Sequence, residues 1–247
     1  MFRLLPSQAH PFQAAWRSYL LAIGPAILLL SVLQLLVGYQ GSFLLLHHSW
    51  GPFWDLVMPH LTHLADGALV TGVLMLLFAK KETPLMTALF LAILLVGIIV
   101  MALKQGVFPD WNRPAGVFEE GQVRELSLGK ERMFSFPSGH SAAAACLGWF
   151  IAGLGRRVWW GILVGGTTCF LAFTRVYLGV HFPGDLLAGL LLGSVIAFAS
   201  VWVSGWWWNN LEAASPRSKH GWRIAVGTMG ALLIIISIVN LLTRYYL

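Results

Sequence analysis

The sequence predicts an all-α fold, a polytopic bundle of membrane-spanning helices. Of its 247 residues, 57% are hydrophobic and only 11% are charged, whereas a globular domain is about 25% charged. Long uncharged runs recur along the chain, and the hydrocarbon core of a bilayer requires roughly 20 mostly apolar residues per helix. Basic residues gather at the ends of these runs, which is typical of multi-pass membrane proteins.

Seven apolar runs are expected to cross the membrane. In chain order they cover residues 18–38, 66–79, 83–104, 139–155, 158–177, 184–208 and 222–242. The first run is longer than the apolar part of a signal peptide and no small-residue cleavage motif follows it, so we expect a retained helix. Residues 42–64 are apolar but interrupted by prolines, histidines and an aspartate, which predicts an interfacial helix or hairpin. Cys146 and Cys169 fall inside two of the runs and are expected to be packing residues.

The basic residues also predict which helix ends face the cytoplasm. If the N-terminus is inside, nearly every short inside loop is basic. The inside residues are then Arg3, Arg17, Lys80, Lys81, Arg156, Arg157, Arg217, Lys219 and Arg223. This arrangement accounts for the net charge of +6, so no nucleic-acid partner is expected.

Polar residues concentrate in three clusters on the opposite, non-cytoplasmic side. The clusters are Lys104 with Arg113 and Pro114, then Pro137 to His140, then Arg175 with His181 and Asp185. They follow the third run, begin the fourth, and occupy the turn between the fifth and sixth. The first two are joined by a connection of about 30 residues, longer than ordinary loops and therefore expected to be functional. We expect the three clusters to form one site at the membrane surface.

The residue types in these clusters indicate phosphate chemistry. Lys104, Arg113 and Arg175 supply ammonium and guanidinium donors that match phosphoryl oxygens. Ser138 and Gly139 open a helix, where free backbone N–H groups and the positive end of the helix dipole favour an anion. A phosphate could be held there without a metal ion, so no metal and no cofactor are expected.

Two histidines and an aspartate predict a covalent reaction. His181 and Asp185 lie one turn apart if the sixth run begins near Pro183. The carboxylate would fix one ring nitrogen and leave the other free to attack, which makes His181 the expected nucleophile. His140, at the start of the fourth run, is placed to protonate the leaving alkoxide and then to activate water.

The three clusters together resemble the signatures of the type 2 phosphatidic acid phosphatase family. The matching residues are Lys104…Arg113-Pro114, Pro137-Ser138-Gly139-His140 and Arg175-x5-His181-x3-Asp185. This chain has eight residues between the lysine and Arg-Pro, where the family usually has six. Thr174 also stands where the family commonly has serine. The resemblance implies a six-helix core over roughly residues 18–208.

The resemblance implies a metal-independent hydrolase acting on a lipid phosphate or diphosphate through a phosphohistidine. Candidate substrates are undecaprenyl diphosphate, phosphatidylglycerol phosphate, phosphatidic acid and lipid A. We expect residues 1–208 to form the phosphatase core and residues 209–247 a cytoplasmic loop with an additional transmembrane helix. The expected location is the inner (cytoplasmic) membrane, with the active site facing the periplasm or exterior. The expected partners are the bilayer and the lipid substrate, with no obligatory protein partner.

Several alternatives stay open at this point. A phosphate- or phospholipid-binding transporter would need the same cations but would not need His140, His181 or Asp185. The family's similarity to vanadium-dependent haloperoxidases also allows vanadate in the phosphate site. His47, His48, His60 and His63 could bind a metal, although they have no evident carboxylate partner, and interfacial histidines are the preferred interpretation. Arg124, Lys130 and Arg132 in the long connection are either solvated charges or contacts for a distal phosphate or sugar.

Overall fold

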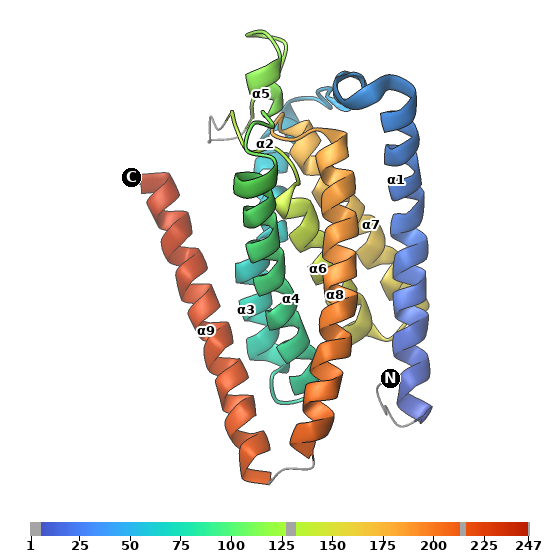
Figure 1. Ribbon diagram of the computed structural model, residues 1–247, viewed down its shortest axis with the longest axis vertical. Coiled ribbons are helices and arrows are strands. Elements are labelled where there is room, and N and C mark those ends of the chain that lie inside the picture. The colour runs from blue at the N-terminus through green and yellow to red at the C-terminus, as the bar shows by residue number, and fades with distance from the viewer. Residues whose placement is uncertain (1–5, 127–131, 213–215, 247) are drawn as a thin grey trace.

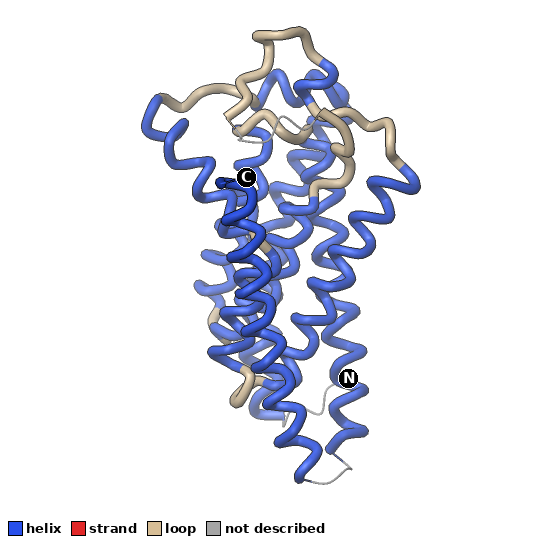
Figure 2. Tube along the Cα trace, turned by 90° about the vertical axis from the view of Figure 1, so that its left-hand side faces the viewer, coloured by secondary structure: helices blue, strands red, loops and turns tan. Residues whose placement is uncertain are grey.

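A computed structural model of the chain describes residues 6–126, 132–212 and 216–246, and in these ranges it contains helices and loops but no strand (Figures 1 and 2). The prediction of an all-α fold is therefore confirmed. Figure 2 shows that the longer loops gather at one end of the bundle, whereas the helices run roughly parallel through the rest of it. In chain order the elements are α1 (Pro6–Leu46), α2 (Pro52–Leu61), the 3-10 turn η1 (Thr62–Ala65), α3 (Gly67–Phe78), α4 (Thr83–Ala102), the π-helical turn η2 (Leu103–Val107), α5 (Pro114–Val117), α6 (Gly139–Gly155), α7 (Val158–Tyr177), α8 (Pro183–Glu212) and α9 (Pro216–Tyr246).

Each of the seven predicted runs is a helix, and the membrane character of the bundle is clear from several of them. Among the described residues, four segments are long and apolar enough to cross a bilayer: Ala14–Leu46, Thr83–Val107, Pro183–Ser204 and His220–Thr243. The pair Pro52–Ala65 and Gly67–Phe78, bent by 57°, adds a fifth if it counts as one span. With four or five such segments, the protein is a multi-pass membrane protein. The expected total of seven crossings stays a prediction.

The interfacial segment predicted between the first two runs differs in detail from the structure. Helix α1 extends to Leu46, past a kink at Gly38, whose φ of 73° is readily adopted only by glycine. Helix α2 and η1 then lead to Asp66, whose carboxylate accepts hydrogen bonds from the N–H groups of Ala68 and Leu69, each at 3.1 Å. Asp66 is thus an N-cap of α3, which satisfies N–H groups that the helix itself leaves unpaired.

Helix α6 forms the centre of the bundle and packs against α8 at close range. Its first half is a run of small residues, Ser141 to Ala145, that is fully buried. A Cβ added to Gly193 of α8 would lie 2.1 Å from the carbonyl oxygen of Ala142, and one added to Gly189 would lie 2.5 Å from that of Ser138. Small residues at such contacts let membrane helices approach closely. The approach brings the N-terminal ends of α6 and α8 together.

Helix α9 lies on the outside of the bundle, along α3 (Figure 1). Its contact depends on glycines, because a Cβ on Gly72 would lie 2.7 Å from the carbonyl oxygen of Gly230. Many of its large apolar side chains are exposed, among them Ile224, Leu232 and Ile235. Exposed apolar side chains on a span of this length are suited to contact with lipid.

The long connection between η2 and α6 covers the loop-rich end of the bundle. Its two ends are held together, because the N–H of Arg113 donates to the carbonyl of Arg132 at 2.8 Å and the N–H of Ser135 donates to that of Trp111 at 2.7 Å. Between these two ends, the N–H of Leu126 donates to the carbonyl of Leu178 in the turn after α7. The three predicted clusters therefore meet at this end.

Candidate active site

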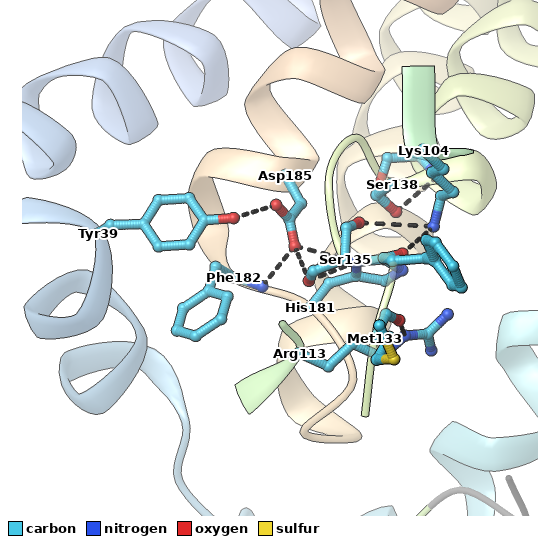
Figure 3. Close-up of polar contacts among 11 residues, drawn as sticks. Tyr39, Lys104, Arg113, Met133, Ser135, Ser138, His181, Phe182 and Asp185 are labelled. Carbon is cyan, nitrogen blue, oxygen red and sulfur yellow. Dashed lines mark hydrogen bonds and ion pairs between the residues drawn. The ribbon is translucent and has the colours of Figure 1, made fainter. Parts of the chain in front are cut away.

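The centre of the site is the His181–Asp185 pair in the turn that joins α7 to α8. Gly179, with a φ of 74°, lets the chain reverse after α7, and Pro183 begins α8. The Nδ1 atom of His181 lies 3.0 Å from Oδ2 of Asp185, and the two side chains are 2% and 0% exposed (Figure 3). The predicted one-turn spacing is thus present. With the proton on Nδ1 shared with the carboxylate, Nε2 carries the lone pair.

The carboxylate of Asp185 accepts hydrogen bonds from four groups. Its Oδ2 accepts from the hydroxyl of Ser135 at 2.6 Å and the N–H of Phe182 at 3.0 Å, in addition to His181. Its Oδ1 accepts from the hydroxyl of Tyr39 on α1. The sequence did not predict Ser135 or Tyr39 as site residues. Ser135 stands two positions before the second cluster, which is a usable signal. Tyr39 lies just past the end of the first apolar run, and no motif marks it.

The environment of His181 keeps its ring neutral. Burial lowers the pKa of His181 to about 3. The hydrogen bond from its ring to Asp185 and the negative charge of that carboxylate oppose the shift, whereas the positive charges of Arg175 and Lys104 add to it. A neutral imidazole retains the lone pair that a nucleophile requires.

The N-terminus of α6 forms the second part of the site. The hydroxyl of Ser138 accepts a hydrogen bond from the N–H of Ser141 at 3.3 Å and caps the helix. The N–H of Ser138 donates to the carbonyl oxygen of Asp185 at 3.1 Å, which ties this helix end directly to the dyad. Gly139 is the first helical residue, and His140 follows it, half-buried.

The three predicted cations come from three different elements. Arg175, at the end of α7, is 8% exposed, and its NH1 donates to the hydroxyl of Thr62 at 2.9 Å. Its carbonyl accepts from the N–H of His181 at 3.3 Å. Arg113 precedes α5, and its Nε donates to the carbonyl of Met133 at 3.1 Å. Thr62, on η1, is a further residue that the sequence did not single out.

Lys104 reaches the site in spite of its unusual spacing from Arg113. Helix α4 ends in the π-helical turn Leu103–Val107, in which the N–H of Phe108 donates to the carbonyl of Leu103. A π-helical turn holds more residues than an α-helical one. The ammonium of Lys104 donates to the carbonyl of Phe134 at 2.5 Å and lies 3.5 Å from that of Ser135. Figure 3 shows Lys104 beside Ser135 and Ser138, so the longer spacing does not remove it from the site.

The cations predicted as head-group contacts are engaged elsewhere or lie outside the described residues. Arg124 forms an ion pair with Asp55 at 2.6 Å and lies over the ring of Tyr177. Arg132 donates from NH1 to the carbonyl of Ala115 at 3.1 Å. Lys130 lies outside the described residues. Contacts of these three residues with a lipid head group stay a prediction.

One of the four histidines considered for a metal site has a structural role. His47 is 8% exposed, its Nδ1 lies 2.8 Å from the carbonyl of Val176, and its Nε2 accepts from the N–H of Arg124 at 3.1 Å. Both ring nitrogens are therefore used, which fixes the proton on Nδ1. Within the described part of the chain, no three His, Cys, Asp or Glu residues are grouped as metal ligands. Metal independence itself stays a prediction.

A helical membrane bundle with a buried His–Asp pair, a helix N-terminus and three cations at one end belongs to the class of membrane proteins that handle a phosphate group. Comparison with known families is consistent with this class. The model of the PAP2 superfamily matches residues 62–209, and the chain belongs to that superfamily. The predicted family, type 2 phosphatidic acid phosphatases, is thereby confirmed.

Individual relatives match parts of the chain. A lipid A 4'-phosphatase of Bacteroides thetaiotaomicron is 42% identical over 60 residues, which are 24% of this chain and 27% of that protein. An undecaprenyl-diphosphatase of Sulfolobus acidocaldarius is 41% identical over 86 residues, 35% of this chain and 37% of that protein. These matches span well under two thirds of either relative. The crystal structure of Aquifex aeolicus LpxE is similar over 66% of this chain and 94% of that one, with 27% identity and a TM-score of 0.58.

Proposed function

We propose that this protein hydrolyses a lipid phosphate or diphosphate by transferring the phosphoryl group to His181. The observation that carries the proposal is the buried pair of His181 and Asp185, whose side chains lie 3.0 Å apart. The positive charges of Arg175 and Lys104 act on this pair. A histidine with an orienting carboxylate is the arrangement of an activated nucleophile. Neutral His181 among positive charges is suited to attack an anionic phosphate.

The reaction has two displacements. In the first, Nε2 of His181 forms a bond to the terminal phosphorus, and the bond from that phosphorus to the oxygen of the leaving group breaks. His140 gives a proton to the departing oxygen, which is an alkoxide for a monophosphate and a lipid phosphate for a diphosphate. In the second, His140 takes a proton from water, the resulting hydroxide attacks phosphorus, and the P–N bond breaks to restore neutral His181. Lys104, Arg113, Arg175 and the N-terminus of α6 offset the charge on the phosphoryl oxygens in both steps.

The lipid nature of the substrate is supported by an apolar groove on the two helices that also carry His140 and Arg175. The groove has a volume of about 210 Å³ and runs between α6 and α7. On α6, Ala144, Leu147 and Ile151 follow His140 at helical spacing, and on α7, Leu171, Thr168 and Val164 precede Arg175 in the same way. The faces that present His140 and Arg175 therefore also line the groove. The groove extends about 10 Å along α6, from Ala144 to Ile151. A hydrocarbon chain attached to a bound phosphate could lie along this length.

The named relatives suggest which lipids to test. They include enzymes named for lipid A, for undecaprenyl diphosphate and for phosphatidylglycerophosphate. These three lipids, with phosphatidic acid, are the proposed substrate candidates. The basic loops favour a site on the outer face of the cytoplasmic membrane.

A transporter or binding protein without hydrolytic activity is the second candidate. Its cations and helix N-terminus would be the same, but a binding site needs no histidine oriented by a carboxylate. The saturated hydrogen bonding of Asp185 around His181 therefore favours the enzyme.

The test is phosphate release from a panel of lipid phosphates by the purified protein, with and without EDTA. We expect release from at least one lipid, little change with EDTA, and no turnover in the His181→Ala variant. Labelled substrate followed by an alkaline quench should trap a phosphoenzyme that is stable to base and labile to acid. The matched control is His60→Ala, because His60 is an exposed histidine that is not one of the proposed site residues. Adduct formation by His181→Ala would show that another residue is the nucleophile, and no release from any lipid would favour the binding protein.

A further inference from the structure

Tyr39 approaches the dyad from a part of the chain outside the family match. It stands on α1, directly after the kink at Gly38, whereas the PAP2 model begins at residue 62. Its hydroxyl donates to Oδ1 of Asp185 (Figure 3). In that view, Tyr39 reaches the carboxylate from the side opposite to Lys104 and Arg113. It therefore touches the orienting residue directly.

Several contacts hold the Tyr39 ring in this position. It packs on Phe182 with ring centroids 4.4 Å apart and meets Trp111 of the long connection edge-on at 5.4 Å. Gly184, at the start of α8, makes room for it, because a Cβ there would lie 2.6 Å from Cε2 of the ring. The kink and the glycine together direct the hydroxyl to a single acceptor.

The two carboxylate oxygens of Asp185 have different partners. Oδ2 serves His181, Ser135 and the N–H of Phe182, and Oδ1 serves Tyr39. A buried carboxylate that accepts from both oxygens cannot turn without breaking a hydrogen bond, and such bonds to a charged group are strong. The orientation of Asp185, and through it that of the imidazole, thus depends on α1 as well as on α8.

We propose that Tyr39, assisted by Ser135, is a positioning residue that fixes the Asp185 carboxylate and thereby sets the tautomer and proton affinity of His181. This inference rests on the proposed function of His181 as nucleophile. It assigns a role in the reaction to the first helix, through a residue that binds neither phosphate nor lipid. The Tyr39 hydroxyl offsets part of the negative charge of Asp185. Without it, the carboxylate attracts a proton on His181 more strongly.

The expected result of Tyr39→Phe is a fall in kcat of about ten- to a hundred-fold, the value of one hydrogen bond to a charged group, with KM nearly unchanged. The acid limb of the pH profile of kcat/KM should move to higher pH, because His181 then holds a proton more readily. The charged groups that act on His181 are otherwise the same, namely Asp185 from α8, Arg175 from α7 and Lys104 from η2. Ser135→Ala should shift the acid limb in the same direction. Ser135→Thr keeps a hydroxyl, so its acid limb should lie where that of the wild type does.

Tyr19→Phe is the matched control. Tyr19 is on the same helix, is fully buried, and donates to the backbone carbonyl of Ala145 on α6 at 3.0 Å. It therefore anchors α1 to the bundle without touching the dyad. If Tyr39 only anchors α1, both Phe variants will have the same kcat and the same pH profile, and the proposal is wrong. A purely KM effect of Tyr39→Phe would also overturn it.

A second readout does not depend on hydrolysis. In ¹⁵N-histidine NMR spectra of the protein in detergent, the His181 signals are assigned by their loss in His181→Gln. We expect the Nδ1–H tautomer in the wild type and a changed tautomer ratio or titration in Tyr39→Phe and Ser135→Ala, but not in Tyr19→Phe. If the wild type releases no phosphate, the proposed function fails while this spectrum still tests the positioning. Identical His181 signals in all variants would refute the positioning role even in an active enzyme.

Discussion

At the scale of single residues, the site combines a deeply buried histidine with a carboxylate that has no exposed surface. An isolated buried charge is unfavourable, and four hydrogen-bond donors offset this for Asp185. His181 avoids the same cost by remaining neutral, with its pKa lowered to about 3 by burial. The arrangement makes the native fold sensitive to acid at one identifiable position.

That sensitivity gives a prediction about stability. The ordinary pKa of histidine is 6.5, so below this pH the unfolded chain binds a proton at His181 that the native protein binds only near pH 3. The contribution of His181 to the free energy of unfolding is fully present above pH 6.5 and is lost as the pH falls from 6.5 toward 3. Between pH 7 and 5.5 the wild type should lose about 1 kcal/mol relative to His181→Asn. Thermal denaturation in detergent at both pH values measures this.

The control for this measurement is His60→Asn, at an exposed histidine. Its stability should follow that of the wild type across the same pH range. A wild type and a His181→Asn variant that lose stability in parallel between pH 7 and 5.5 would contradict a neutral, buried His181.

At the scale of elements, α6 and α7 serve two purposes along one shared face. Their ends at the loop-rich side present His140 and Arg175, and the turns below line the apolar groove. The small residues that let α6 approach α8 lie beside this face. In the proposed function, the same helices place a phosphate and guide the chain attached to it.

Filling the groove should alter chain selectivity. Thr167 lines the groove, is exposed, and donates to the carbonyl of Leu163 within its own helix at 2.9 Å. Thr167→Trp should lower kcat/KM for a long-chain lipid phosphate about tenfold or more and leave a short-chain analogue nearly unaffected, because each buried methylene contributes about 0.8 kcal/mol. Initial rates on a series of chain lengths measure this.

Thr228→Trp provides the matched control for the groove. Thr228 is an exposed threonine on α9 that donates to the carbonyl of Ile224 at 3.0 Å, as Thr167 does to Leu163. The control should show no dependence on chain length beyond that of the wild type. Equal effects of Thr167→Trp on short and long chains would mean that the groove holds bulk lipid and not the substrate.

At the scale of the whole molecule, the bundle has two chemically different ends. The site and the long connection occupy one end, and the turns α3–α4 and α6–α7 occupy the other (Figure 1). The second end carries Lys80, Lys81, Arg156 and Arg157, of which Arg156 pairs with Glu82. Basic short loops are retained in the cytoplasm, and the proposal that the site faces outward rests on this rule.

This orientation is testable with single cysteines in a background in which Cys146 and Cys169 are replaced by alanine. Gln122→Cys in the long connection and Lys81→Cys in the α3–α4 turn are both at exposed positions. In intact cells, a membrane-impermeant maleimide should label Gln122→Cys, whereas Lys81→Cys should react only after permeabilisation. The background protein is the control for non-specific labelling, and the reverse pattern would place the site on the inner leaflet.

The sequence by itself determined the helices and the end of the bundle where the site lies. Apolar runs of bilayer length must become helices, because backbone groups in lipid can be satisfied only within the segment or by a closed barrel. Successive helices then alternate in direction, and the clusters of Lys104, Ser138 and His181 must meet at one end. The pairing of His181 with Asp185 also followed, since the four-residue spacing after Pro183 is a local property.

Only the tertiary structure decided what surrounds that pair. Tyr39 is 146 residues from Asp185 and Ser135 is 50 residues from it, and no local pattern records contacts of this kind. The partners of Arg124 and His47, and the π-helical turn that carries Lys104 to Ser135, likewise follow from how the long connection packs on the helix ends. Hydrophobic periodicity determines which residues are buried in lipid or protein, but the hydrogen-bond partner of a polar group depends on which helices lie side by side.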